Sequence, residues 1–279
     1  MSSRPSLSIS VVSFSPDISL LRRTLATLWV SLEYAQEQKS LGEVFFWLID
    51  NGPGHAWKEE LQALFEAELD GVDWRTVKLI SGQGNVGYGQ AHNIAIRQST
   101  CDYHLVLNPD VMLEQDAIHE AVTFMEAHKD VGLLAPSVVE KDGTRQYLCK
   151  RYPSIFDLFL RGFAPSVLKR VFRRRLDYYE MRDLTGPEPL FDVPMVGGAF
   201  IFCRCALLNE LRGFSKDFFM YFEDFDLSLR AGRISRTAYV PDVKITHVGG
   251  NAAKKGVKHI IMFVRSALTF FGRHGWKWF

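Results

Sequence analysis

Between residues 7 and 128 the chain alternates between short apolar runs and longer segments with helical periodicity. The apolar runs cover residues 7–14, 44–49, 76–80 and 103–107, and the helical segments cover residues 17–36, 57–69, 91–98 and 115–128. Strands that alternate with helices in this way form a parallel sheet with helices on both faces. The nearly continuous apolar character of residues 44–49 is typical of a strand covered on both sides. We therefore predict an α/β fold with a doubly wound, mostly parallel sheet.

Past residue 133 this regular alternation ends. Residues 137–147 contain Lys-Asp-Gly-Thr, which indicates a hairpin, and residues 154–185 form an apolar and basic insertion. The elements expected further on are a strand at 193–202, helices at 206–211 and 224–231, one or two strands at 237–246, and an amphipathic helix at 259–271. Because no linker or repeat separates the two parts, we predict one domain over residues 1–279 with a functionally distinct second half.

The composition is that of a globular protein, with 47% hydrophobic and 23% charged residues. No stretch approaches the roughly 20 uncharged apolar residues of a membrane-spanning helix, so we do not expect a membrane span. The chain begins with a few polar residues and a strand rather than an apolar signal segment, so secretion is not expected. Four irregularly spaced cysteines without zinc-site spacing predict reduced thiols. These features indicate a cytoplasmic protein.

The net charge of +1 hides an uneven distribution. Seven Lys and Arg residues and no acid follow Asp242, so residues 1–242 carry a net charge of −6. A second basic block, residues 161–175, contains six cations and no acid. In the tail the cations alternate with aromatic and aliphatic residues, an arrangement that suits an interfacial helix on an anionic membrane. The alternative for each block is a solvated basic helix face.

Polar or glycine-rich groups follow four of the predicted strands. They are Ser13 with Ser15, Asp50 with Asn51, the loop 81–89, and Asn108 with Asp110. Each group alone is also an ordinary turn. In an open parallel sheet, however, ligands bind beyond the carboxyl ends of the strands, so the four groups together predict one binding crevice. No Gly-Lys-Ser/Thr follows the loop, so it differs from a Walker loop, and the G-x-G-x-x-G spacing is lacking at the first predicted strand, which disfavours dinucleotide binding.

Two positions are candidates for metal or phosphate binding. Asp110, directly after a predicted strand, suits a divalent cation that is otherwise coordinated by phosphates and water. The alternative is an Asn-Pro-Asp turn that caps a helix beginning near Glu114. His247, at the end of another predicted strand, is either a metal or phosphate ligand or a polar residue with an ordinary hydrogen bond.

A cluster of acids at Glu223, Asp224 and Asp226 directly follows the aromatic run 218–222. Apolar surroundings raise the pKa of a carboxyl group and favour its use as a general base near neutral pH. The alternative is that Asp224 or Asp226 caps the following helix, with Arg230 as an ion-pair partner for Asp226 on the helix face.

Several segments, taken together and in this order, resemble one known family. They are VVSF near the start, LIDNG, NVGYGQAHN, LNPD, VGGAFIF, GFSKDFFMYFEDFDLSLR, and His247 before Gly249 and Gly250. They resemble the family-2 inverting glycosyltransferases with the GT-A fold, most strongly the bacterial rhamnosyltransferases of O-antigen and cell-wall polysaccharide assembly. The segments extend from about residue 8 to residue 250, so the resemblance covers most of the chain.

The resemblance implies a role for each site residue. The implied binding residues are Val12, Ser13 and Asp50 for the base and ribose, Gly87 and Asn93 for the nucleotide sugar, and Gly198 on the acceptor side. Asn108 and Asp110 occupy the Asp-x-Asp position of the family, with Asn108 in place of the first aspartate. Coordination of Mg²⁺ or Mn²⁺ is therefore expected from Asp110 with His247. Asp224 would be the catalytic base, with Glu223 beside it.

The reaction implied by the resemblance moves one sugar with inversion, from dTDP-L-rhamnose to a lipid-diphosphate-linked saccharide. Residues 1–135 would bind the nucleotide sugar, residues 136–250 would hold the acceptor and the base, and residues 251–279 would be a basic tail at the cytoplasmic face of the inner membrane. The chain lacks the Gln-x-x-Arg-Trp motif of processive synthases. The alternatives are another UDP- or dTDP-sugar donor, or a non-catalytic nucleotide-sugar-binding protein; a nucleic-acid partner is not expected.

Overall fold

The computed structural model describes residues 4–52, 57–68, 77–140, 142–248 and 256–279. Parts of some predicted segments lie outside the described residues. They are Leu69 of the predicted helix 57–69, Thr76 of the predicted strand 76–80, Lys141 of the hairpin, Gly249 and Gly250 after His247, and Lys254 and Lys255 of the basic tail.

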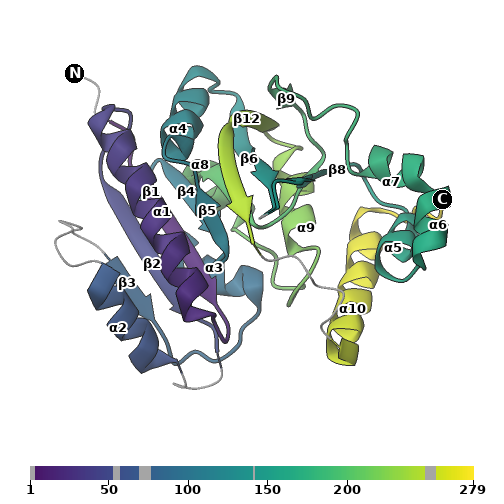
Figure 1. The fold of residues 1–279 in the computed structure, drawn as a ribbon, viewed down its shortest axis with the longest axis horizontal. Coiled ribbons are helices and arrows are strands. Elements are labelled where there is room, and N and C mark those ends of the chain that lie inside the picture. The colour runs from purple at the N-terminus through teal and green to yellow at the C-terminus, as the bar shows by residue number, and fades with distance from the viewer. Residues whose placement is uncertain (1–3, 53–56, 69–76, 141, 249–255) are drawn as a thin grey trace.

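A ten-stranded mixed sheet forms the centre of the molecule (Figure 1). Its strands are β1 (Leu7–Ser13), β2 (Val44–Asp50), β3 (Val77–Ile80), β4 (Tyr103–Leu107), β5 (Val111–Leu113), β6 (Val131–Val139), β7 (Arg145–Gln146), β9 (Leu190–Phe191), β11 (Phe200–Arg204) and β12 (Arg236–His247). The order is β3-β2-β1-β4-β11-β6-β12-β5, with β7 on β6 and β9 on β12. The pairs among β1 to β4 are parallel, as is β6 with β12, whereas β11 is antiparallel to both neighbours. The predicted α/β fold with a mostly parallel sheet is confirmed.

Helices cover both faces of this sheet. They are α1 (Ile18–Glu37), α2 (Lys58–Glu68), α3 (Tyr88–Ile96), α4 (Ala117–Ala127), α8 (Cys205–Leu211) and α9 (Glu223–Ala231). Alternate residues of β2 show the two layers: Phe46 and Leu48 pack with α1 and α2, whereas Trp47 and Ile49 pack with α3. Because both faces are buried, the strand needs apolar residues at every position, which explains the continuous apolar run.

The predicted single strand at residues 193–202 is wrong. Its first part is β10 (Met195–Val196), which pairs with β8 (Cys149–Lys150) in a separate two-stranded sheet, and its second part is β11 in the central sheet. The break falls at Gly197 and Gly198, which a continuous apolar pattern does not reveal. Residues 237–246, in contrast, belong to one long strand, β12, whose register on β6 shifts between Val240 and Lys244.

The insertion 154–185 and the C-terminal segment lie side by side, away from β3 and α2 (Figure 1). The insertion contains α5 (Ile155–Gly162), α6 (Ser166–Val171) and α7 (Arg173–Tyr179), and the C-terminal segment contains α10 (Gly256–His274). The N–H of Ile155 donates to the carbonyl of Lys277 over 2.8 Å, and the rings of Phe156 and Phe279 stack at 5.3 Å. The two basic segments of the sequence are therefore neighbours in the structure.

Candidate active site

The ends of β1 and β2 present two buried polar groups side by side. Ser13 and Asp50 are register partners in the parallel pair, and Asp50 is 1% exposed. Oδ1 of Asp50 accepts a hydrogen bond from the N–H of Gly52 over 3.0 Å. Oδ2 of Asp50 and Oγ of Ser13 have no hydrogen-bond partner among the described residues. Buried polar atoms without a partner are costly, so this pair is suited to a polar ligand such as a ribose or base.

The glycine-rich loop adds further polar groups beside this pair. Gln83 donates from Nε2 to the carbonyl of Asp50 over 2.6 Å, and its Oε1 is buried without a partner in the described part of the chain. Asn51 connects to the same loop by accepting from the N–H of Val86 and donating to Oδ1 of Asn85. Gln83 and Asn85 are not among the individually predicted site residues; their position in the loop 81–89 is the sequence signal that locates them.

Gly87 and Asn93 hold this loop and α3 against the segment before α9. Gly87 has φ of 89°, and a Cβ there would lie 2.4 Å from the carbonyl oxygen of Phe219. Asn93 is buried, donates from Nδ2 to the carbonyl of Phe214 over 2.8 Å, and accepts from the N–H of Phe214 over 2.9 Å. This geometry gives Asn93 a structural role, and its predicted contact with the nucleotide sugar stays a prediction.

Asp110 and His247 come together because β5 pairs antiparallel with β12, with Val111 opposite His247. Nε2 of His247 lies 3.3 Å from Oδ1 of Asp110, and Nδ1 lies 2.8 Å from Oε1 of Gln146. The Asn-Pro-Asp turn therefore leads into a strand, and α4 begins only at Ala117. The alternative in which this turn caps a helix is wrong.

The arrangement of Asp110 and His247 fits a shared cation. When Nδ1 of the imidazole donates to the amide oxygen of Gln146, the lone pair of Nε2 faces Asp110. Oδ1 of Asp110 has no hydrogen-bond partner among the residues that the structure describes. Across the same residues, no group of three or more His, Cys, Asp or Glu side chains is placed to hold a metal ion. One or two protein ligands completed by phosphates and water are typical of Mg²⁺.

The acids Glu223 and Asp224 lie in the first turn of α9, after a strained segment. Tyr221 and Phe222 both have positive φ, 72° and 65°, a backbone region that is costly for residues with a side chain. Oδ2 of Asp224 accepts from the N–H of Gly198 over 2.8 Å. Phe222 is the N-cap and Asp224 caps no helix, so the capping alternative for Asp224 is wrong.

The two carboxyl groups differ in pKa. Burial, followed by the charge of Asp224, raises the pKa of Glu223 to about 8. Burial also raises the pKa of Asp224, but the N–H groups of Gly198 and Phe225 oppose this increase, and its pKa is about 6. Asp224 is therefore the more acidic of the two and the better candidate to accept a proton near neutral pH, whereas burial favours the neutral form of Glu223.

Asp226, the third acid, is a structural anchor between α9 and α10. It is fully buried and bonded by Arg230 at 2.7 Å, Arg273 at 3.0 Å and His274 at 2.9 Å. Burial alone would raise the pKa of Asp226, but these three partners outweigh it and hold the pKa below its ordinary value. The predicted pairing of Asp226 with Arg230 is confirmed.

Tyr88 connects the turn that contains Asn108 to the backbone that holds Asp224. Its hydroxyl lies 2.9 Å from Oδ1 of Asn108 and 2.6 Å from the carbonyl oxygen of Gly198, the residue whose N–H bonds Asp224. Burial and then the charges of Glu223, Asp224 and Asp110 raise the pKa of Tyr88 well above its ordinary value. Tyr88 is therefore surrounded by the candidate carboxylates, which its position in the loop alone did not indicate.

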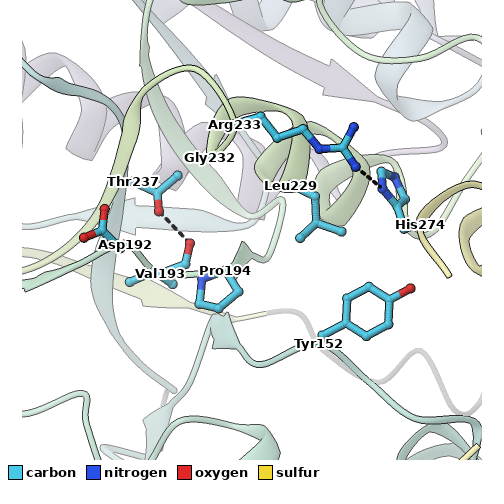
Figure 2. A pocket seen from close by; sticks show the side chains of 9 residues that line it. All are labelled: Tyr152, Asp192, Val193, Pro194, Leu229, Gly232, Arg233, Thr237 and His274. Atoms are coloured by element: carbon cyan, nitrogen blue, oxygen red, sulfur yellow. Dashed lines mark hydrogen bonds between the residues drawn. The ribbon is translucent and has the colours of Figure 1, made fainter. Parts of the chain in front are cut away.

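The described residues form a small cavity and a larger one that both involve the second half of the chain. One of about 180 Å³ is lined by Gln146, Tyr147, Leu148, Lys150, Arg161, Gly197, Asp224 and Phe225. Another, of about 420 Å³, lies at the far end of α9 and contains none of the predicted site residues. Figure 2 shows its lining, where Thr237 donates to the carbonyl of Val193 and the side chains of Arg233 and His274 meet. The smaller cavity is thus the one that belongs to the site.

This fold and site define a glycosyltransferase of the GT-A class, and a structural comparison agrees. The crystal structure of GalNAc-T7 with UDP, GalNAc and Mn²⁺ superposes with a TM-score of 0.63 at 16% identity, over 91% of this chain and 45% of that chain. The chain belongs to glycosyl transferase family 2, whose family model matches residues 21–198.

Two curated relatives are similar over most of the chain. The N-acetylglucosaminyl-diphospho-decaprenol L-rhamnosyltransferase of Mycobacterium tuberculosis is 26% identical over 72% of this chain and 69% of its own length. The rhamnosyltransferase WbbL of Escherichia coli (strain K12) is 27% identical over 60% of this chain and 62% of its own length. The chain therefore spans about two thirds of the length of these relatives.

Proposed function

We propose that this glycosyltransferase moves one L-rhamnose from dTDP-L-rhamnose, with inversion, to a lipid-diphosphate-linked saccharide in bacterial surface polysaccharide assembly. The observation that carries the proposal is the position of Asp224, a partly buried carboxylate that lines the small cavity and accepts a hydrogen bond from the N–H of Gly198. The names of both curated relatives support the sugar, and the name of the mycobacterial relative supports the diphosphate-linked acceptor.

In the proposed reaction, Asp224 removes the proton from an acceptor hydroxyl while that oxygen attacks the anomeric carbon of the donor. The bond from this carbon to the diphosphate oxygen breaks, and the nucleoside diphosphate leaves on the opposite side, so the configuration inverts. The proton ends on Asp224. Ser13 and Asp50, at the ends of β1 and β2, are the proposed partners of the base and ribose, and Val12 is buried beside them.

Asp110 and His247 are the proposed protein ligands of Mg²⁺ or Mn²⁺. Such an ion stabilises the negative charge that develops on a leaving diphosphate. The support is the pair of facing electron donors at 3.3 Å, together with the Mn²⁺ in the solved structure of similar fold. Asn108, at the first position of this motif, bonds Tyr88 and so positions the turn that carries Asp110.

Within this proposal, residues 1–135 bind the nucleotide sugar, residues 136–250 hold the acceptor and the base, and residues 251–279 attach to a membrane surface.

The exposed apolar residues of α10 follow the spacing of one helix face: Val257, Ile260, Ile261, Val264 and Leu268. Phe270 and Phe271 are instead buried against the protein. Together with Lys258 and Arg265 at its edge, this exposed face suits an anionic bilayer, which we propose is the cytoplasmic face of the inner membrane. No described helix has the length and apolar character to cross a bilayer.

A panel of nucleotide sugars tests the donor. Each donor is tested with two acceptors. The first, called the diphosphate acceptor, is N-acetylglucosamine diphosphate on a short polyprenyl chain; the second, called the neutral acceptor, is an alkyl glycoside of the same sugar. We expect transfer from dTDP-L-rhamnose to the diphosphate acceptor and loss of transfer on addition of EDTA. Preferred transfer from another UDP- or dTDP-sugar would assign a different donor. Nucleotide binding without transfer from any donor would support a non-catalytic binding protein.

Co-sedimentation with vesicles tests the membrane proposal. We expect binding to vesicles of anionic phospholipid and weaker binding to zwitterionic vesicles, and Ile261→Asp should weaken the anionic binding because it places a charge in the apolar face of α10. Val30→Asp is the matched control, since Val30 is an exposed apolar residue on α1. Equal sedimentation of the wild type and Ile261→Asp would contradict the proposal.

A further inference from the structure

Two basic side chains line the small cavity beside Asp224, and the proposed reaction gives them no role. Lys150, the last residue of β8, and Arg161, in the last turn of α5, both line it. Lys150 is 4% exposed, whereas the side chain of Arg161 is half exposed. A lysine buried to this degree is uncommon unless its charge is matched by a partner.

The partner of Lys150 is shared among three cations. Oε1 of Glu180 lies 3.3 Å from Nζ of Lys150 and 3.6 Å from Nε of Arg161. Oε2 of the same carboxylate accepts from Nη2 of Arg182 over 2.6 Å. Arg182 is also paired with Asp177, at 3.2 Å. Lys150 and Arg161, the two cations that line the cavity, therefore share one carboxylate.

The pKa of Lys150 reflects its burial first and its charged neighbours second. Burial, followed by the charge of Arg161, lowers the pKa of Lys150 to about 7, although Glu180 acts in the opposite direction. A bound anion would favour the charged lysine, because an opposite charge nearby stabilises the ionised form. The cavity wall therefore has the charge and the geometry of an anion-binding site.

We propose, on the basis of the proposed function above, that Lys150 and Arg161 bind the diphosphate of the acceptor and hold its sugar against Asp224. The cavity that they line contains the base itself, so a molecule in it presents its hydroxyl to the group that deprotonates it. The donor diphosphate has a separate candidate site at Asp110 and His247. The two sites adjoin, because Gln146 lines the cavity and bonds His247.

The surroundings of Arg161 favour a lipid-linked diphosphate over a free nucleotide. Phe159 and Phe163, two residues to either side in the chain, are 44% and 49% exposed, and Val167 in α6 is 73% exposed. Exposed apolar residues therefore belong to the same chain segment as Arg161. A polyprenyl diphosphate requires this combination of a cationic site and an adjacent apolar surface, whereas a nucleotide does not.

The test measures equilibrium binding of the two acceptors to the full chain in the presence of saturating dTDP and Mn²⁺, which occupy the donor site. We expect the wild type to bind the diphosphate acceptor more tightly than the neutral acceptor. Lys150→Gln and Arg161→Gln should each weaken binding of the diphosphate acceptor by about 10- to 100-fold, because each removes a charge-assisted hydrogen bond. Binding of the neutral acceptor and of dTDP should not change.

Arg151→Gln is the matched control, because Arg151 is the next residue in the chain but pairs with Asp183 and does not line the cavity. It should leave the affinities for both acceptors unchanged. If Lys150→Gln fails to fold, which circular dichroism reports, the half-exposed Arg161 decides the question.

Three results would overturn this assignment: equal affinity of the wild type for both acceptors, equal weakening of the neutral acceptor in the variants, or weakened dTDP binding. The last of these would assign the cations to the donor diphosphate. If the wild type binds the diphosphate acceptor selectively, and does so through Lys150 and Arg161, but transfers no rhamnose, the proposed function fails and the anion site stands.

Discussion

The backbone N–H of Gly198 donates a hydrogen bond of 2.8 Å to Oδ2 of Asp224, which joins the break between β10 and β11 to the first turn of α9. Oδ1 of the same carboxylate accepts from the N–H of Phe225 over 2.9 Å. Both bonds favour the charged form and so oppose the effect of burial. Asp224 is therefore held in one orientation and keeps a pKa low enough to be a base at neutral pH.

Replacement of the proposed base should stop the chemical step. Asp224→Asn keeps the shape of the side chain but cannot accept a proton, so kcat should fall by about 10²- to 10⁴-fold while dTDP binding is retained. Steady-state transfer to the diphosphate acceptor and titration with dTDP measure the two effects. The control is Asp183→Asn, which removes an acid paired with Arg151 outside the site. Transfer at the wild-type rate would refute the role of Asp224.

The pH dependence of transfer should follow Asp224. Because the base must be ionised, kcat/KM should fall as the pH decreases below about 6, the pKa of Asp224. Glu223, with a pKa of about 8, is already protonated in that range. Glu223→Gln should therefore leave the acid limb of the profile in place. The measurement is kcat/KM from about pH 5 to about pH 8. The assignment to Asp224 is contradicted if kcat/KM does not fall at the acid end, or if the pH of this fall changes in Glu223→Gln.

Glu223→Gln should also make the folded protein more stable than the wild type at higher pH. Burial raises the pKa of Glu223 above its unfolded value, so the folded state binds more protons between these two values. The unfolding free energy of the wild type therefore decreases as the pH rises through this window. Glu223→Gln should have the higher thermal midpoint at pH 8, by roughly 2–4 °C for each kcal/mol gained, and should resemble the wild type below about pH 4.

Glu210→Gln, an exposed position on α8, is the control for this stability measurement. Its thermal midpoint should follow that of the wild type at every pH. Among the described residues, Oε2 of Glu223 is buried without a hydrogen-bond partner, so the charged form should be destabilising. If Glu223→Gln is less stable than the wild type at pH 8, the carboxylate is instead stabilising there and this prediction is wrong.

Metal dependence should localise to Asp110 and His247. Asp110→Asn and His247→Gln should each raise the Mn²⁺ concentration for half-maximal transfer by at least about tenfold, because each removes one of the two proposed ligands. The control is His119→Gln, since His119 lies on α4 and bonds Ser40, which is not one of the proposed site residues. An unchanged Mn²⁺ requirement in both variants would place the ion elsewhere.

Loss of the anchor at Asp226 should loosen α10. Asp226→Asn leaves Arg230, Arg273 and His274 without a buried anion, and breaking such a buried network costs about 3–5 kcal/mol. Chemical denaturation measures the loss. Asp130→Asn, which breaks an exposed pair with Arg236, should cost less than about 1 kcal/mol. Equal effects of the two substitutions would show that the Asp226 network is not stabilising.

The order of strands and helices in the first half could be predicted because its signals are local. A strand that is buried on both faces must be apolar along its length, as β2 is, and a polar residue at its end is visible in the sequence. Ser13 and Asp50 end adjacent parallel strands, so the general rule for such sheets was enough to place them at one edge. The acids 223–226 were likewise visible as candidates from their aromatic neighbours.

The tertiary structure alone decided which of these candidates act together and which serve the fold. Asp224 and Asp226 have the same chemistry in the sequence, yet one bonds backbone N–H groups beside a cavity and the other is neutralised by three side chains. Asp110 and His247, and likewise Lys150 and Glu180, meet through pairings between distant segments. Burial and charge pairing depend on those distant partners, and a pKa depends on burial and pairing, so no local pattern determines them.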